Sequence, residues 1–104
     1  TSWQAAAELG ILLQDGLGTS QDDCQAYRYL AEAERYLADV WEPLDAMVLN
    51  ALGVAYGFGR GTDENIKLAI DYFDRAIDFG LEKAKANKAR FRRSLFGLGK
   101  WARR

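Results

Sequence analysis

The chain has 104 residues, a formal net charge of −1 and 28% charged residues, which is the size of one small domain. It contains no histidine and one cysteine, Cys24. It therefore lacks the side chains on which Ser-His and Cys-His catalysis, cysteine-based zinc sites and internal disulfides depend. It also has no run of about 20 apolar residues, the length that a transmembrane helix needs. We expect a non-enzymatic binding protein without catalytic, cofactor-binding or metal-binding residues.

Acidic and basic residues are unevenly distributed along the chain. Residues 1–82 hold all 15 acidic residues and 5 of the 14 basic ones. Residues 83–104 hold the other 9 basic residues and no acidic one. Such a separation indicates the chemistry of a binding partner and says little about the fold.

An internal repeat extends over most of the chain. The dipeptide Leu9-Gly10 recurs 43 residues later as Leu52-Gly53. At the same spacing Gly16, Gly18, Ala26, Tyr29 and Ala33 recur as Gly59, Gly61, Ala69, Tyr72 and Ala76. Because so many positions agree at one spacing, the sequence predicts an internal duplication.

The first unit is predicted to form two helices. The i, i+3, i+4, i+7 spacing of one buried helical face is found in Ala6, Leu9, Gly10 and Leu13. The glycines at 16 and 18 end this helix, since glycine tolerates left-handed conformations. The second apolar stripe consists of Ala26, Tyr29, Leu30, Ala33 and Leu37. The small residues of both stripes are expected to let the helices approach closely, with the tyrosines packed between them.

The second unit repeats this arrangement after an insert at 36–45. Pro43, the only proline, is expected in the first turn of the next helix, where a missing N–H costs no hydrogen bond. Thr62 is expected to cap the fourth helix, and Gly80 to end it. Residues 82–96 follow at a spacing of 36 and are predicted to form the first helix of a degenerate third unit.

These residues resemble a known repeat. Residues 49–61 read Leu-Asn-Ala-Leu-Gly-Val-Ala-Tyr-Gly-Phe-Gly-Arg-Gly, and residues 69–80 follow as Ala-x-x-Tyr-Phe-x-x-Ala-x-x-x-Gly. This pattern looks like the Sel-1-like repeat, a relative of the tetratricopeptide repeat. Residues 5–37 fit the same scheme, with Leu13 where tyrosine is usual.

The resemblance implies an all-α fold, an α-solenoid of antiparallel helix hairpins. About five helices are expected, from two Sel-1-like repeats and a C-terminal helix. The whole chain, residues 1–104, would be a single repeat domain. It would consist of repeat one with the start of the insert at 1–40, repeat two at 41–80, and a degenerate third-repeat helix with a basic tail at 81–104.

Families of this repeat are generally adaptors and scaffolds. The resemblance therefore implies a protein-protein interaction scaffold, or an accessory subunit of a multiprotein complex, that binds other proteins through a helical-repeat groove. Aromatic side chains outside the repeat stripes are candidate anchors, because such side chains dominate interface energetics. The candidate partner-binding residues are the aromatics Trp41, Phe58 and Trp101, and the basic residues Lys88, Arg92, Arg93 and Arg103.

The basic segment 83–104 has three interpretations. It is a solvated capping helix, or it binds an acidic protein surface, including residues 1–82 of a neighbouring copy. Alternatively it binds RNA or anionic lipid as part of a peripheral subunit. Phe91, Phe96 and Trp101 lie among its basic residues, as base stacking requires, but the acidic remainder of the chain would repel a long phosphate backbone.

The compartment is inferred from cysteine usage. So small a domain without disulfide bonds is expected to be intracellular. The sequence starts at Thr1 and not at methionine, which fits a removed initiator, a cleaved targeting segment or a piece of a longer protein. The expected location is the cytosol or an organelle interior, mitochondrial or plastid if a targeting segment was removed.

Overall fold

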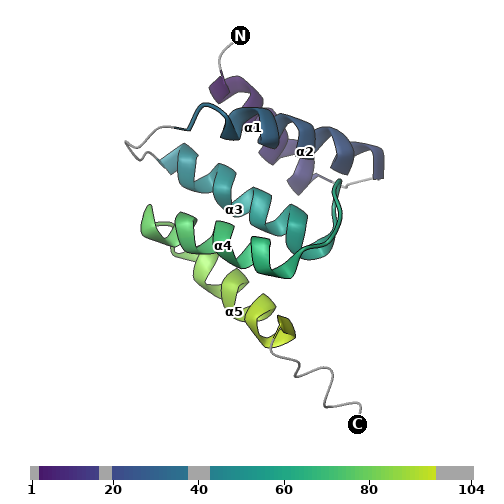
Figure 1. Ribbon diagram of the computed structural model, residues 1–104. Coiled ribbons are helices and arrows are strands. Elements are labelled where there is room, and N and C mark those ends of the chain that lie inside the picture. Colours follow the sequence, from purple (N-terminus) through teal and green to yellow (C-terminus); the bar gives the residue numbers. More distant parts are fainter. Residues whose placement is uncertain (1–2, 17–19, 38–42, 96–104) are drawn as a thin grey trace.

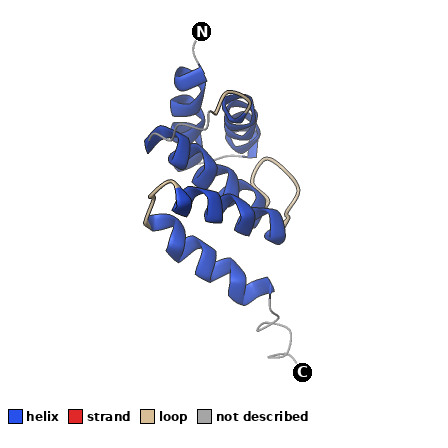
Figure 2. Cartoon of the chain, turned by 60° about the vertical axis from the view of Figure 1, so that its left-hand side comes forward, coloured by secondary structure: helices blue, strands red, loops and turns tan. Residues whose placement is uncertain are grey.

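The structure is a computed structural model that describes residues 3–16, 20–37 and 43–95. In these ranges the chain forms helices and no strand (Figure 2). The helices are α1 (Trp3–Asp15), α2 (Ser20–Glu34), α3 (Pro43–Phe58), α4 (Ile66–Asp78) and α5 (Lys83–Leu95). They are stacked in chain order, so that α1 and α2 lie at one end and α5 at the other (Figure 1). This arrangement confirms the predicted all-α solenoid.

Two glycines set the distance between the helices of each hairpin. A Cβ atom on Gly10 of α1 would lie 2.9 Å from Cγ of Leu30 on α2. A Cβ atom on Gly53 of α3 would lie 2.5 Å from Cε1 of Phe73 on α4. These separations are too short for a side chain, which confirms that the repeated glycine permits the close approach of α1 to α2 and of α3 to α4.

The central element of the stack is α3. It contacts each of the other four helices. Val48, Leu49, Leu52 and Ala55 on α3 are at most 1% exposed. A helix that is apolar on most of its surface needs neighbours on several sides. The first hairpin (α1 and α2) lies on one side of α3, and α4 and α5 lie on its other sides, so α3 is the common core of the stack.

The observed helix ends agree with the predicted ones at Pro43 and Gly80 and differ at the beginning of α4. Pro43 is the first residue of α3, and Gly80, with φ of 93°, follows the end of α4. The cap of α4 is Asn65, whose side-chain oxygen accepts a hydrogen bond from the N–H of Leu68 at 3.1 Å, so the prediction for Thr62 is wrong.

The loop before α4 is longer than the sequence suggested because it folds back on α3. Gly59 and Gly61 both have positive φ, 68° and 80°, a conformation that other residues rarely adopt. These two turns bring the N–H of Asn65 to within 2.8 Å of the carbonyl oxygen of Tyr56. The helix therefore begins only at Ile66.

The buried face of α1 differs from the predicted stripe. Leu9 is 40% exposed, whereas Ala7, Gly10 and Gln14 are buried. Gln14 is held by a hydrogen bond from its Nε2 to the carbonyl oxygen of Ala51 on α3, at 2.8 Å. The reason for the difference is that α1 packs on α2 and α3, and no helix of the described ranges covers the side that carries Leu9.

The fifth helix, α5, is formed by the residues that the 36-residue spacing assigns to the first helix of a third unit. Ala84 and Phe91 are its buried residues. The ring of Phe91 stacks on that of Phe73, with centroids 5.8 Å apart, and it lies against Gly57 of α3. One aromatic side chain thus anchors α5 to both helices of the second hairpin.

Replacing Gly53 by alanine should destabilise the fold by about 1–3 kcal/mol, because the new methyl group overlaps the buried ring of Phe73. Gly16→Ala is the matched control, since its Cβ would meet neighbouring atoms only at 3.5 Å. Urea unfolding followed by circular dichroism measures both variants. Equal unfolding free energies for the two variants would contradict the close approach at Gly53.

Candidate protein-interaction surfaces

A groove of about 380 Å³ lies between α1 and the beginning of α3. It is lined mainly by apolar side chains, and two carboxylates come from α1. The lining residues are Glu8, Ile11, Leu12, Asp15, Pro43, Leu44 and Met47. Because Glu8 and Asp15 are spaced i, i+7, they lie on the same face of the helix. This arrangement suits a partner segment that combines apolar side chains with lysine or arginine.

Phe58, predicted as an anchor, lies at the end of α3 and is 47% exposed. Its ring packs edge-on against that of Phe91, with centroids 4.9 Å apart. The guanidinium of Arg90 lies 5.0 Å from the centroid of the Phe58 ring. At the 43-residue spacing Phe58 corresponds to Asp15, so both occupy the same face of equivalent helices.

The basic side chains of α5 are partly engaged within the chain. Lys88 forms an ion pair with Asp74 of α4, with Nζ and Oδ1 2.6 Å apart. Lys85 pairs with Glu82 at 3.1 Å, and Arg90 covers Phe58. Lys88 and Arg90 thus contact α4 and α3, whereas the pair of Lys85 with Glu82 is local and exposed.

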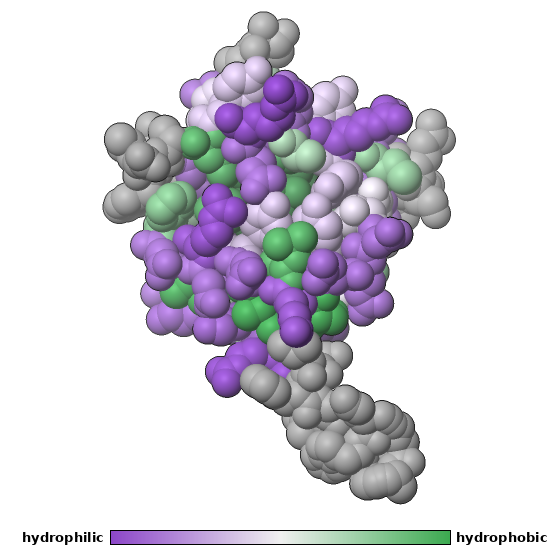
Figure 3. Space-filling view, in the orientation of Figure 1, coloured by the Kyte–Doolittle hydropathy of each residue, from purple (hydrophilic) through white to green (hydrophobic). Residues whose placement is uncertain are grey.

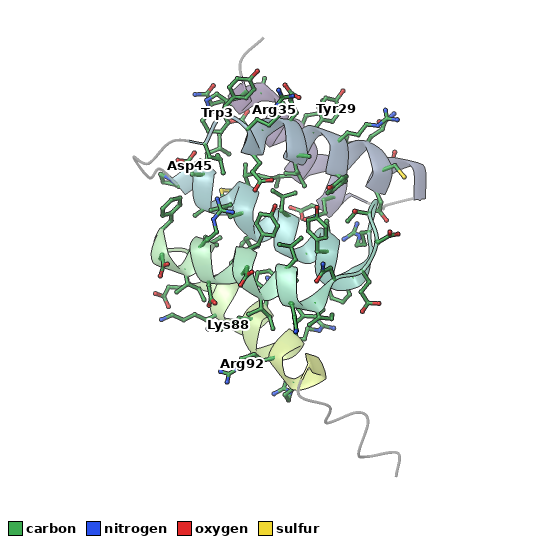
Figure 4. All side chains as sticks on the ribbon, in the orientation of Figure 1. Trp3, Tyr29, Arg35, Asp45, Lys88 and Arg92 are labelled. Carbon is green, nitrogen blue, oxygen red and sulfur yellow. The ribbon has the colours of Figure 1, made fainter. Side chains whose placement is uncertain are left out.

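Arg92 and Arg93 are exposed in the last turn of α5, where the negative end of the helix dipole favours cations. Figure 4 shows Lys88 and Arg92 at the end of the stack that α5 forms. Trp41, Trp101 and Arg103 lie outside the described residues. The structure thus places Phe58 and Lys88 on neighbouring elements and brings Arg90, which was no candidate, onto Phe58.

The outer side of α5 differs from the equivalent side of α3. Leu49 of α3 is fully buried, and its counterpart 36 residues later is Lys85, which is exposed. Gly53, which meets the ring of Phe73, corresponds to the exposed Ala89. The surface by which α3 contacts its hairpin partner is therefore replaced in α5 by a surface suited to water.

A row of polar side chains connects the two hairpins. The hydroxyl groups of Tyr27 and Tyr56 share a hydrogen bond of 2.7 Å, and the ring of Tyr56 stacks on that of Tyr72 at 5.6 Å. The hydroxyl of Tyr72 donates to the carboxylate of Glu34, at 2.9 and 3.0 Å. Arg75 reaches the same carboxylate at 3.5 Å. Residues of α2, α3 and α4 are thereby held in one register.

Arg60 forms a second polar connection between the hairpins. Its Nη2 donates to the carbonyl oxygen of Gln14 at 2.7 Å and to Oδ1 of Asp23 at 2.8 Å. Nε also donates to Oδ1 of Asp23, at 3.2 Å. The glycine loop of the second hairpin is thus attached to the end of α1 and the beginning of α2.

The environment of two tyrosines changes their acidity. Burial, with added effects from the hydrogen bond to Tyr27 and the negative charge of Glu34, raises the pKa of Tyr56 to about 12. Burial also raises the pKa of Tyr72 well above its usual range, and Glu34 acts in the same direction. Both side chains therefore stay neutral in the folded chain under conditions in which an unfolded tyrosine ionises.

Residues 3–16, 20–37 and 43–95 contain no group of three or more His, Cys, Asp and Glu side chains placed to hold a metal ion. Cys24 is an exposed, free cysteine. In the same ranges no helix has the length and apolar character needed to cross a membrane. On the face seen in Figure 3, hydrophilic residues predominate, and hydrophobic residues emerge in patches between them.

Sequence reasoning missed the groove and the two polar connections. The sequence does contain a signal for the groove, because Leu12 lies outside the predicted stripe and between two acidic residues seven positions apart. It contains no comparable signal for the contacts of Arg60 or Glu34, since their partners lie 37 or more residues away along the chain.

Alkaline unfolding should report on the raised tyrosine pKa values. Because the folded chain keeps Tyr56 and Tyr72 protonated, their contribution to stability is complete below pH 10 and is lost as the pH rises from 10 toward about 12. Urea unfolding at a series of pH values should show this loss. A variant with Tyr56→Phe and Tyr72→Phe should lose less stability over the same range, and an equally steep loss would contradict the assignment.

Comparison with known proteins agrees with this architecture. The family model of the Sel1 repeat matches residues 3–35 and 46–80, which correspond to the two hairpins. No curated protein and no solved structure matches the chain. Sel1 repeats generally mediate protein–protein interaction and form a non-catalytic repeat family. Since the two matches together cover more than half of the sequence, the chain belongs to the Sel1 repeat family.

Proposed function

We propose that this chain is a non-enzymatic adaptor or accessory subunit that binds a segment of another protein in the groove between α1 and α3. The observation that carries the proposal is the groove itself, with an apolar floor that includes Ile11, Leu44 and Met47 and with carboxylates from Glu8 and Asp15. Apolar sites with a few charged groups at their edge are typical of peptide recognition by helical repeats.

The charge of the groove defines the partner segment. Residues 1–82 carry all 15 acidic residues of the chain, and Glu8 and Asp15 are both exposed at the groove. A partner with lysine or arginine beside two or three large apolar residues would complement this surface. Phe58 lies at the position equivalent to Asp15, one repeat further along, and is 47% exposed.

Selection from a library of random displayed peptides tests the proposal on the intact chain. The selected peptides should combine large apolar residues with lysine or arginine. Charge reversal in the variant Glu8→Lys with Asp15→Lys should weaken binding of a selected peptide at least about tenfold, as measured by fluorescence anisotropy, because it replaces attraction by repulsion.

The control variant is Asp71→Lys with Asp78→Lys. It changes the net charge by the same amount, at the same i, i+7 spacing, on the exposed side of α4. This variant should keep most of the affinity. Selection without enrichment, or an equal loss in both variants, would contradict binding in the groove.

The alternative, a peripheral subunit that binds RNA or anionic lipid through residues 83–104, has one observation in its favour. Lys83, Arg92 and Arg93 lie exposed on α5. The pairing of Lys85 and Lys88 with carboxylates supports the capping role instead. Tight, steeply salt-dependent binding of a random RNA or of phosphatidylserine vesicles, unaffected by charge reversal at Glu8 and Asp15, would favour this alternative.

A further inference from the structure

One side of α3 stays open although α3 lies in the middle of the stack. It carries Met47, Val54 and Phe58, whose i, i+7, i+11 spacing places them on one helical face. Phe58 is 47% exposed, and the other two side chains are partly exposed. Because α3 contacts helices both before and after it in the stack, this side is not the one by which the units pack on each other. We call it, together with the equivalent sides of α1 and α5, the open side.

On α1 the open side is acidic. At the 43-residue spacing Phe58 of α3 corresponds to Asp15 of α1. Ile11 and Glu8, four and seven residues before Asp15, lie on the same helical face. Both carboxylates are exposed, and they are the only charged residues of α1. The open side is therefore negative where it crosses α1.

On α5 the open side is basic. At the 36-residue spacing Met47 corresponds to Lys83 and Val54 to Arg90, and both cations are exposed. Within residues 3–16, 20–37 and 43–95 neither of them forms an ion pair with a carboxylate. The described residues therefore leave their positive charge to be neutralised by a partner.

Contacts join the three open sides into one surface. The groove of about 380 Å³ connects the acidic face of α1 with Met47 of α3. On the same face of α3, Phe58 has its ring centroid 5.0 Å from the guanidinium carbon of Arg90 on α5. The surface thus changes from acidic at α1 through apolar at α3 to basic at α5.

We propose that the segment bound in the groove crosses all three helices and carries its charges in a fixed order, an inference that rests on the proposed function. A lysine or arginine lies at α1, large apolar residues lie at α3, and an aspartate or glutamate lies at α5. Attraction at both ends holds the segment in one orientation, because the reversed orientation would bring like charges together.

The packing of the helices sets the separation of the two charges. Helices in contact lie about 8–10 Å apart, so that α1 and α5, which both contact α3, are separated by roughly 16–20 Å. A helix with its side chains is about 10–12 Å wide, more than this spacing, which favours an extended segment. Since an extended chain covers about 3.3 Å per residue, the basic and acidic residues of the partner are about five or six positions apart.

The peptides selected on the intact chain from a random displayed library test this order. Their sequences should show an acidic residue about five or six positions from the basic one, with large apolar residues between them. Enriched peptides that are basic and apolar but have no such acidic residue would overturn this inference and leave binding in the groove intact. Selection without enrichment would overturn both.

Charge reversal on α5 tests the acidic end of the segment. The variant Lys83→Glu with Arg90→Glu should weaken binding of a selected peptide at least about tenfold in fluorescence anisotropy. The matched control, Lys85→Glu with Arg92→Glu, changes the same charge at the same i, i+7 spacing on another side of α5. The control should keep most of the affinity, and an equal loss in both variants overturns the proposal.

A charge swap in the peptide separates lost attraction from a damaged fold. Replacing the acidic residue of the peptide by lysine should restore its binding to the variant Lys83→Glu with Arg90→Glu, which a misfolded chain could not show. Replacing the basic residue by glutamate should restore binding only to the variant Glu8→Lys with Asp15→Lys. Absence of either rescue, or rescue by the opposite variant, contradicts the proposed orientation.

Discussion

A helix hairpin buries only the sides by which its two helices meet, and the remaining apolar sides need a neighbouring unit. In this chain α3 has such neighbours, because its residues Val48, Leu49 and Leu52 are almost fully buried between the first hairpin, α4 and α5. The outermost helices, α1 and α5, each leave one side uncovered by the described residues, and these two sides differ in character. The outer side of α5 carries Lys85 and Arg92 toward solvent, whereas the outer side of α1 carries Leu9 and Leu12.

The polar contacts between the hairpins add direction to this apolar packing. Burial alone would tolerate some sliding of α2 along α3, because apolar contacts are not directional. The hydrogen bonds of Tyr72 with Glu34 and of Arg60 with Asp23 fix one register, and Gln14 joins α1 to the backbone of α3. The same register determines how α1 and α3 line the groove, so the binding surface depends on the interface between the hairpins.

Much of the fold followed from the sequence because it is encoded locally. Gly10, Gly53, Pro43 and Gly80 act through backbone geometry and helix spacing, and the structure has each of them in the role that the pattern predicted. The exposure of Leu9 was not predictable from its own helix, since it depends on which neighbours cover α1. The cap of α4 moved to Asn65 because two glycine turns, which a linear pattern does not specify, lengthen the loop. For the same reason the groove required the relative placement of α1 and α3.

Hydrogen exchange of the intact chain, measured helix by helix, tests whether α3 is the shared core of the stack. We expect the slowest exchange in α3, which is covered on several sides, and exchange at least about tenfold faster in α1, which is open along Leu9 and Leu12. Exchange in α1 as slow as in α3 would show that the side of α1 with Leu9 and Leu12 is covered in solution, and slower exchange in α5 than in α3 would contradict α3 as the shared core.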